Sequence, residues 1–64
     1  MSSVEIRGRF ASLALKLSDR SDLHSAAAEK SKASGAIEYA ISELVIAKTL
    51  MDVALAIQEM LKEA

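Results

Sequence analysis

The sequence predicts an all-α protein that folds as a two-helix antiparallel hairpin. Its 64 residues include no proline and only two glycines. Alanine, leucine, glutamate and lysine are abundant, and these residues favour helix over sheet. We expect one domain, with a helix over about residues 3–32, a turn at about 33–35 and a second helix over about 36–63.

The length and composition predict that this domain needs help to be stable. A core of this size supplies only a few kcal/mol, and small domains usually add disulfides, a metal or oligomerisation. The chain has no cysteine and one histidine, His24, so we expect neither a disulfide, a metal nor a cofactor. Self-association is the remaining common support.

The positions of the charged residues argue against a cleaved signal peptide and against a membrane-spanning helix. Glu5, Arg7 and Arg9 lie near the amino terminus without a following apolar segment, unlike a cleaved signal peptide. Lys48 and Asp52 interrupt the most apolar stretch, so we expect no membrane-spanning helix. The expected location is the cytoplasm, or outside it by export without a cleaved signal peptide.

The first helix has a marked start and one narrow apolar row. Ser2 and Glu5 have capping-box spacing, and Met1 and Ile6 are placed to form a hydrophobic staple. A sector of about 60° holds the large apolar residues of this helix. They are Ile6, Phe10, Leu13 and Leu17. Beyond Leu17 the same row continues with polar and small residues, including His24 and Ala28.

Two segments compete as the chain reversal. In "KASGA", Gly35 can end the first helix in a left-handed conformation or cap the second one. The rival is "SDRSD", residues 18–22, whose residues prefer caps and turns to helix interiors. We favour Gly35 because it divides the chain into helices of equal length.

Small residues surround the expected turn. The stretches "HSAAAEK" and "SKASGAIEYA" permit close approach of two helices, although helix propensity alone also explains them. Gly8, inside the first helix, costs about 1 kcal/mol relative to alanine. It marks either a close contact or a tolerated defect.

The second helix has two apolar rows on opposite sides. Eleven of the fourteen residues of "LVIAKTLMDVALAI" are apolar. One row comprises Ile37, Ile41, Leu44, Met51 and Leu55. The other comprises Ile46, Leu50, Val53, Ile57, Met60 and Leu61. Lys48 and Asp52, an i, i+4 pair, share the remaining sector with Thr49, so one partner helix cannot bury both rows.

We therefore expect an oligomer, either a four-helix bundle or a larger helical assembly. Leaving four side chains of the second row in water would forfeit about 6 to 12 kcal/mol, comparable with the stability of a whole domain. The candidate interface residues are Phe10, Leu13, Leu17, Ile46, Leu50, Val53, Ile57 and Leu61. Residues 1–32 carry a net charge of +2 and residues 33–64 carry −3, which suits antiparallel pairing.

The sequence gives little support for an enzyme or for a nucleic-acid-binding protein. The nine serines lie in no Gly-x-Ser-x-Gly motif, and Glu59 and Glu63 are typical of a solvated face, so we do not expect an enzyme. Arg9, Lys16 and Arg20 form a basic line that could contact nucleic acid. The net charge of −1 and the few aromatic residues argue against that partner.

Two further alternatives involve protein partners. The apolar row could receive a helix from a different protein, as in an adaptor, chaperone or inhibitor. In addition, "IAKTLMDVALAIQEML" resembles the last helix of type III secretion needle and inner-rod subunits. That resemblance implies a small helical subunit that polymerises with this helix facing the lumen or core. The chain lacks the proline-containing turn of needle subunits.

Overall fold

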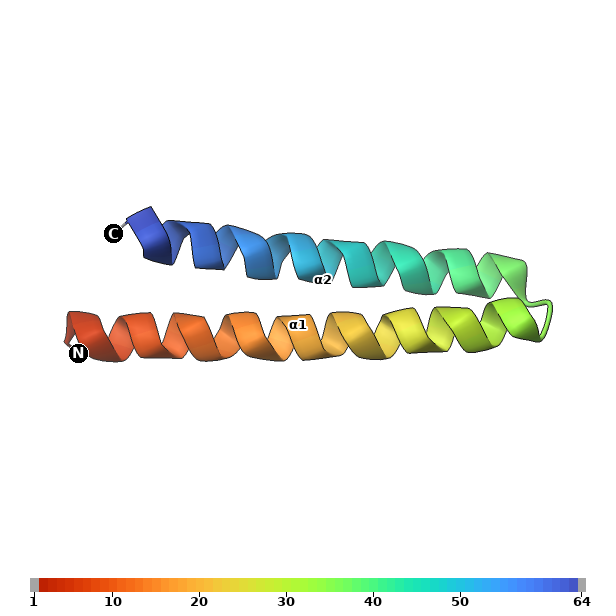
Figure 1. Cartoon of the computed structure of the whole chain (residues 1–64), viewed down its shortest axis with the longest axis horizontal. Coiled ribbons are helices and arrows are strands. Elements are labelled where there is room, and N and C mark those ends of the chain that lie inside the picture. Colours follow the sequence, from red (N-terminus) through yellow and green to blue (C-terminus); the bar gives the residue numbers. More distant parts are fainter. Residues whose placement is uncertain (1, 64) are drawn as a thin grey trace.

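The protein is a hairpin of two long antiparallel helices (Figure 1). The computed structural model describes residues 2–63, in which α1 spans Ser3–Ala33 and α2 spans Ile37–Glu63. The described part of the chain contains no strand and extends over 49 × 15 × 13 Å. The predicted all-α hairpin is confirmed.

The amino-terminal cap of α1 is formed by Ser2. Its hydroxyl oxygen accepts a hydrogen bond from the backbone N–H of Glu5 at 3.2 Å, which satisfies one of the free donors of the first turn. Glu5 also places a negative charge at the positive end of the helix. The predicted staple includes Met1, which lies outside the described residues.

The helix α1 continues without interruption through residues 18–22, so the alternative chain reversal there is wrong. The reason is tertiary. Ser21 is buried, and its hydroxyl donates to the carbonyl oxygen of Ala47 in α2 at 2.7 Å. A side chain bonded to the opposite helix does not compete with the backbone of its own helix.

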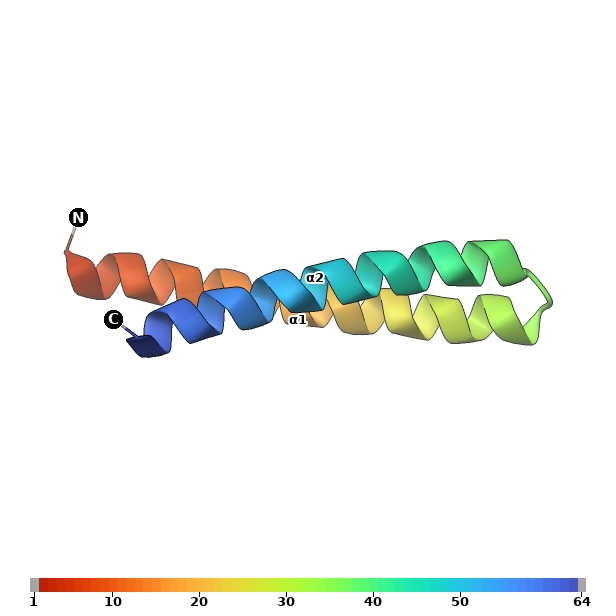
Figure 2. The same ribbon diagram turned by 90° about the horizontal axis from the view of Figure 1, so that it is seen from above.

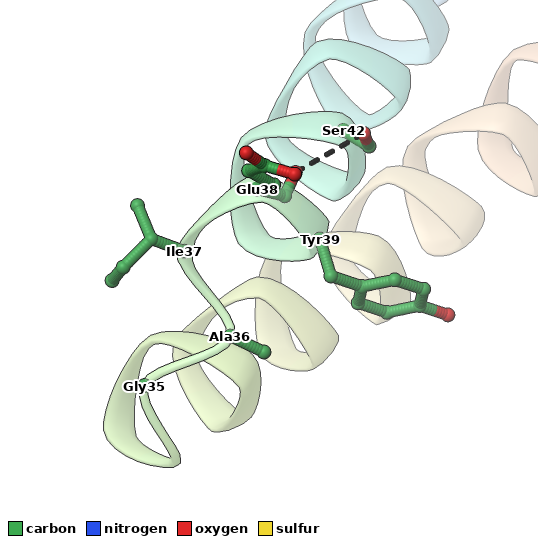
Figure 3. A pocket seen from close by; sticks show the side chains of 6 residues that line it. All are labelled: Gly35, Ala36, Ile37, Glu38, Tyr39 and Ser42. Carbon is green, nitrogen blue, oxygen red and sulfur yellow. Dashed lines mark hydrogen bonds between the residues drawn. The ribbon is translucent and has the colours of Figure 1, made fainter.

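The chain reverses at Gly35. This residue has φ of 86°, a left-handed conformation that glycine adopts without steric cost. The N–H of Gly35 donates to the carbonyl of Lys32 at 3.1 Å, and the N–H of Ala36 donates to that of Ser31 at 2.8 Å. These two bonds form the Schellman motif that closes α1, and Figure 3 shows the chain entering α2 directly afterwards.

Small side chains separate the two helices. The buried residues are Ala14, Ser21 and Ala28 of α1 and Ala40, Glu43, Ala47 and Ala54 of α2, and we call these seven residues the seam. On each helix the small members recur every seven residues. That spacing keeps them on one face over residues 14–28 of α1 and 40–54 of α2.

The seam differs from the core that the apolar rows suggested. Among residues 2–63 no large side chain is fully buried, and every buried apolar residue is an alanine. On α2 the alanines lie between the two predicted apolar rows, which therefore flank the contact on its two sides. Small side chains allow the backbones to approach closely, and the large residues are displaced to the outside.

The separation of the helices follows the size of the side chains between them. Figure 1 shows α2 close to α1 near the turn and farther from it toward the termini, and Figure 2 shows the two ribbons crossing. The seam runs from Ala28 and Ala40 near the turn to Ala14 and Ala54. Only beyond Ala14 and Ala54, toward the termini, do larger residues such as Phe10 and Ile57 border the contact.

The two glycines are expected to respond oppositely to the same substitution. Gly35→Ala should destabilise the protein by about 1 kcal/mol, because alanine is strained at positive φ. Gly8→Ala should stabilise it by about 1 kcal/mol, because Gly8 is in a helix and a methyl group there meets nothing within 4 Å. Urea denaturation followed by circular dichroism measures both. Changes of the same sign would contradict this account.

Candidate protein-interaction surface

Large apolar side chains from both helices gather on one side of the hairpin, in the half near the termini. A groove between the helices is lined there by Ile6, Phe10, Ile57, Met60 and Leu61, together with Arg7. A neighbouring hollow on α1 is lined by Ile6, Phe10, Leu13 and Arg9. We call this side the shared face; its residues are Ile6, Phe10, Leu13 and Leu17 of α1 and Leu50, Val53, Ile57, Met60 and Leu61 of α2.

The shared face brings together most of the residues predicted as an interface. Phe10, Leu13 and Val53 remain 48%, 43% and 45% exposed. Four others are half-buried beside the seam: Leu17, Leu50, Ile57 and Leu61. Ile46, the remaining predicted residue, is exposed and lies two turns closer to the hairpin turn than Val53. The result is an apolar surface two helices wide.

Arg7 of α1 forms a hydrogen bond to α2 at the end of the shared face nearest the termini. Its guanidinium donates to the carbonyl oxygen of Leu61 in the last turn of α2, and carbonyl groups in the last turn of a helix commonly bond to side chains. A positive charge at this position also suits the negative end of the helix. Sequence reasoning missed this contact because it depends on the register between the helices.

The other side of α2 carries a narrower apolar row, which we call the α2 row. Its members Ile37, Ile41, Leu44 and Leu55 are exposed, and Met51 is half-buried. The neighbouring surface of α1 is polar, since Leu44 and Met51 share a hollow with Ser21, Asp22 and Ser25. The α2 row is therefore only one helix wide.

A polar pair lies on the same side of the hairpin as the shared face, beyond it toward the turn. His24 Nδ1 lies 2.5 Å from Oε2 of Glu43, and the two side chains are 35% and 11% exposed. His24 continues the apolar row of α1, and Glu43 occupies a seam position. Glu43 could have been found from its spacing, because it lies three residues after Ala40 and four before Ala47, on the alanine row.

The remaining charges are on the periphery. Arg9, Lys16 and Arg20 are exposed along α1, and Arg9 borders the shared face. On α2 the predicted pair is present, with Nζ of Lys48 3.0 Å from Oδ2 of Asp52. Both side chains of that pair are largely exposed, so it contributes little to stability.

The hollow beside the turn is shallow and open. Gly35, Ala36, Ile37, Glu38, Tyr39 and Ser42 line it. Figure 3 shows Ile37 and Tyr39 pointing in different directions and the Ser42 hydroxyl bonded to the carbonyl of Glu38 at 3.2 Å. These side chains do not converge on a common point.

Residues 2–63 contain neither a metal-binding cluster nor a membrane-spanning helix. No group of three or more His, Cys, Asp or Glu side chains is arranged to hold a metal ion there. Neither α1 nor α2 contains an apolar segment of the length needed to cross a membrane. Comparison with protein-family models, curated proteins and solved structures finds no match for this chain.

Proposed function

We propose that this chain is a non-enzymatic structural module that assembles with a second copy of itself through the shared face. The observation that carries the proposal is the inversion of side-chain sizes. Alanines fill the contact between the helices, whereas Phe10, Leu13 and Val53 remain about half exposed. A four-helix bundle formed by two hairpins would bury these large residues in its centre.

The surface area supports this proposal. The hairpin exposes 4860 Å², whereas a compact monomer of its mass, 6.8 kDa, would expose about 4000 Å². Two separate hairpins expose twice 4860 Å², and a compact protein of twice the mass would expose about 6600 Å². Assembly into a compact dimer would thus remove about 3000 Å², which is typical of an obligate homodimer.

The composition and width of the shared face also favour a second copy of the hairpin over a single helix of another protein as the occupant. Its apolar residues come from α1 and α2 alike, so an occupant has to cover two helices. A second hairpin offers a surface of the same width and composition. Self-complementary packing of one patch on itself is the usual arrangement of symmetric dimers.

Mass measurement over a concentration series tests the proposal. Sedimentation equilibrium should give a plateau at two chains in the micromolar range, with helical circular dichroism. A well-folded species that stays at one chain would contradict the proposal. Continued growth of the mass with concentration would also contradict a closed dimer, and would favour a polymerising subunit that uses the α2 row as well.

A further inference from the structure

We infer that the two hairpins associate in parallel, with all four helix termini at one end and α1 of each chain packed against α2 of the other. This inference rests on the proposed self-association and specifies its geometry. A twofold axis that runs along the helices produces this arrangement. The alternative twofold axis lies across the helices, and it packs α1 on α1 and α2 on α2.

The uneven distribution of apolar residues supports the parallel arrangement. On the side of the hairpin that carries the shared face, the half near the termini is apolar, as the groove between Phe10 and Ile57 shows. The half near the turn carries the pair formed by His24 and Glu43. In a parallel dimer the apolar half meets the apolar half, and the polar pair meets its own copy. A fully overlapping antiparallel dimer would place these polar side chains on leucine and isoleucine, leaving polar groups poorly paired.

The length of the hairpin supports the same choice. An antiparallel dimer can match the apolar halves only by sliding, so that the turns project in opposite directions and half of each hairpin is left uncovered. The parallel dimer overlaps along the whole 49 Å extent. It therefore covers both halves of each hairpin, whereas the shifted antiparallel dimer covers only one.

The charges of the helices discriminate between the two axes. The segment of α1 has six basic and four acidic residues, and the segment of α2 has two basic and five acidic residues. Packing α1 against α2 of the partner brings net charges of +2 and −3 together. Packing like on like would oppose two positive helices and two negative helices, which is unfavourable.

Distances between spin labels test the inference, and the natural absence of cysteine permits one label per chain. Ala33→Cys places an exposed label beside the turn, and Glu5→Cys places one near the termini. Double electron–electron resonance should give label separations within about 30 Å for both variants in a parallel dimer, since helix diameters are about 10–12 Å. With a rise of 1.5 Å per residue, every antiparallel arrangement puts at least one of the two separations above about 40 Å.

The outcomes separate the inference from the proposed function. Two short separations in a species of two chains support the parallel arrangement. One long separation in a species of two chains overturns the parallel arrangement and leaves self-association standing. A labelled protein that sediments as one chain overturns both. The mass of each labelled variant in solution should therefore be measured by sedimentation before its label distances are measured.

Discussion

Leu13→Asp is expected to weaken self-association by about 100-fold or more. Leu13 is 43% exposed in the hairpin, so each chain of the dimer would lose somewhat less than half of the about 1.5 to 3 kcal/mol that burial of a whole leucine contributes, and two chains carry the change. A carboxylate would also have to leave water at the centre of the shared face. Sedimentation equilibrium of the variant should show one chain at concentrations where the unmodified protein shows two.

The matched control for this variant is Leu15→Asp. It introduces the same charge in place of the same residue on the same helix, but a shift of two residues turns the side chain by about 160°. Leu15 is 63% exposed and belongs to neither the seam nor the shared face. Its replacement should leave the mass unchanged. Equal weakening by both variants would contradict the assignment of the shared face.

Ala54→Leu is expected to lower the free energy of unfolding by about 1 to 3 kcal/mol. Ala54 is 1% exposed in the seam, so the three added carbon atoms have no space unless the helices separate. The larger side chain is more hydrophobic, and an argument from hydrophobicity alone would predict stabilisation. Urea denaturation followed by circular dichroism measures the change.

Ala56→Leu provides the comparison for the seam. Ala56 is exposed on α2, two residues after Ala54, so its replacement changes the same group outside the contact. We expect a change within about 0.5 kcal/mol, as for most surface substitutions. If Ala54→Leu is tolerated as well as Ala56→Leu, close approach through alanine does not hold the hairpin together.

Sequence reasoning succeeded where the cause is local. Gly35 was expected to end the first helix, and it does so because its positive φ and two short-range hydrogen bonds involve only neighbouring residues. The cap at Ser2 is local in the same way. The alternative break at residues 18–22 was also drawn from local preferences, but there a contact with α2 outweighs them.

The candidate surface was predicted in part. The apolar row on α1 and the second row on α2 were both visible as helical periodicities, but their meeting on one side of the hairpin was not. That meeting depends on which face of each helix turns inward. Arg7 and Glu43 were missed for the same reason, because their partners Leu61 and His24 lie on the opposite helix.

The sequence by itself determined that this chain is helical and where α1 is capped, because these properties depend on residues a few positions apart. It offered both Gly35 and residues 18–22 for the turn, and the contact of Ser21 with α2 distinguishes them. Only the tertiary structure decided that alanines, rather than leucines and isoleucines, fill the contact between the helices. Helical periodicity shows which residues share a face, but it does not show how closely two helices approach. At close approach small side chains fit the contact, and the large apolar side chains on its flanks remain exposed.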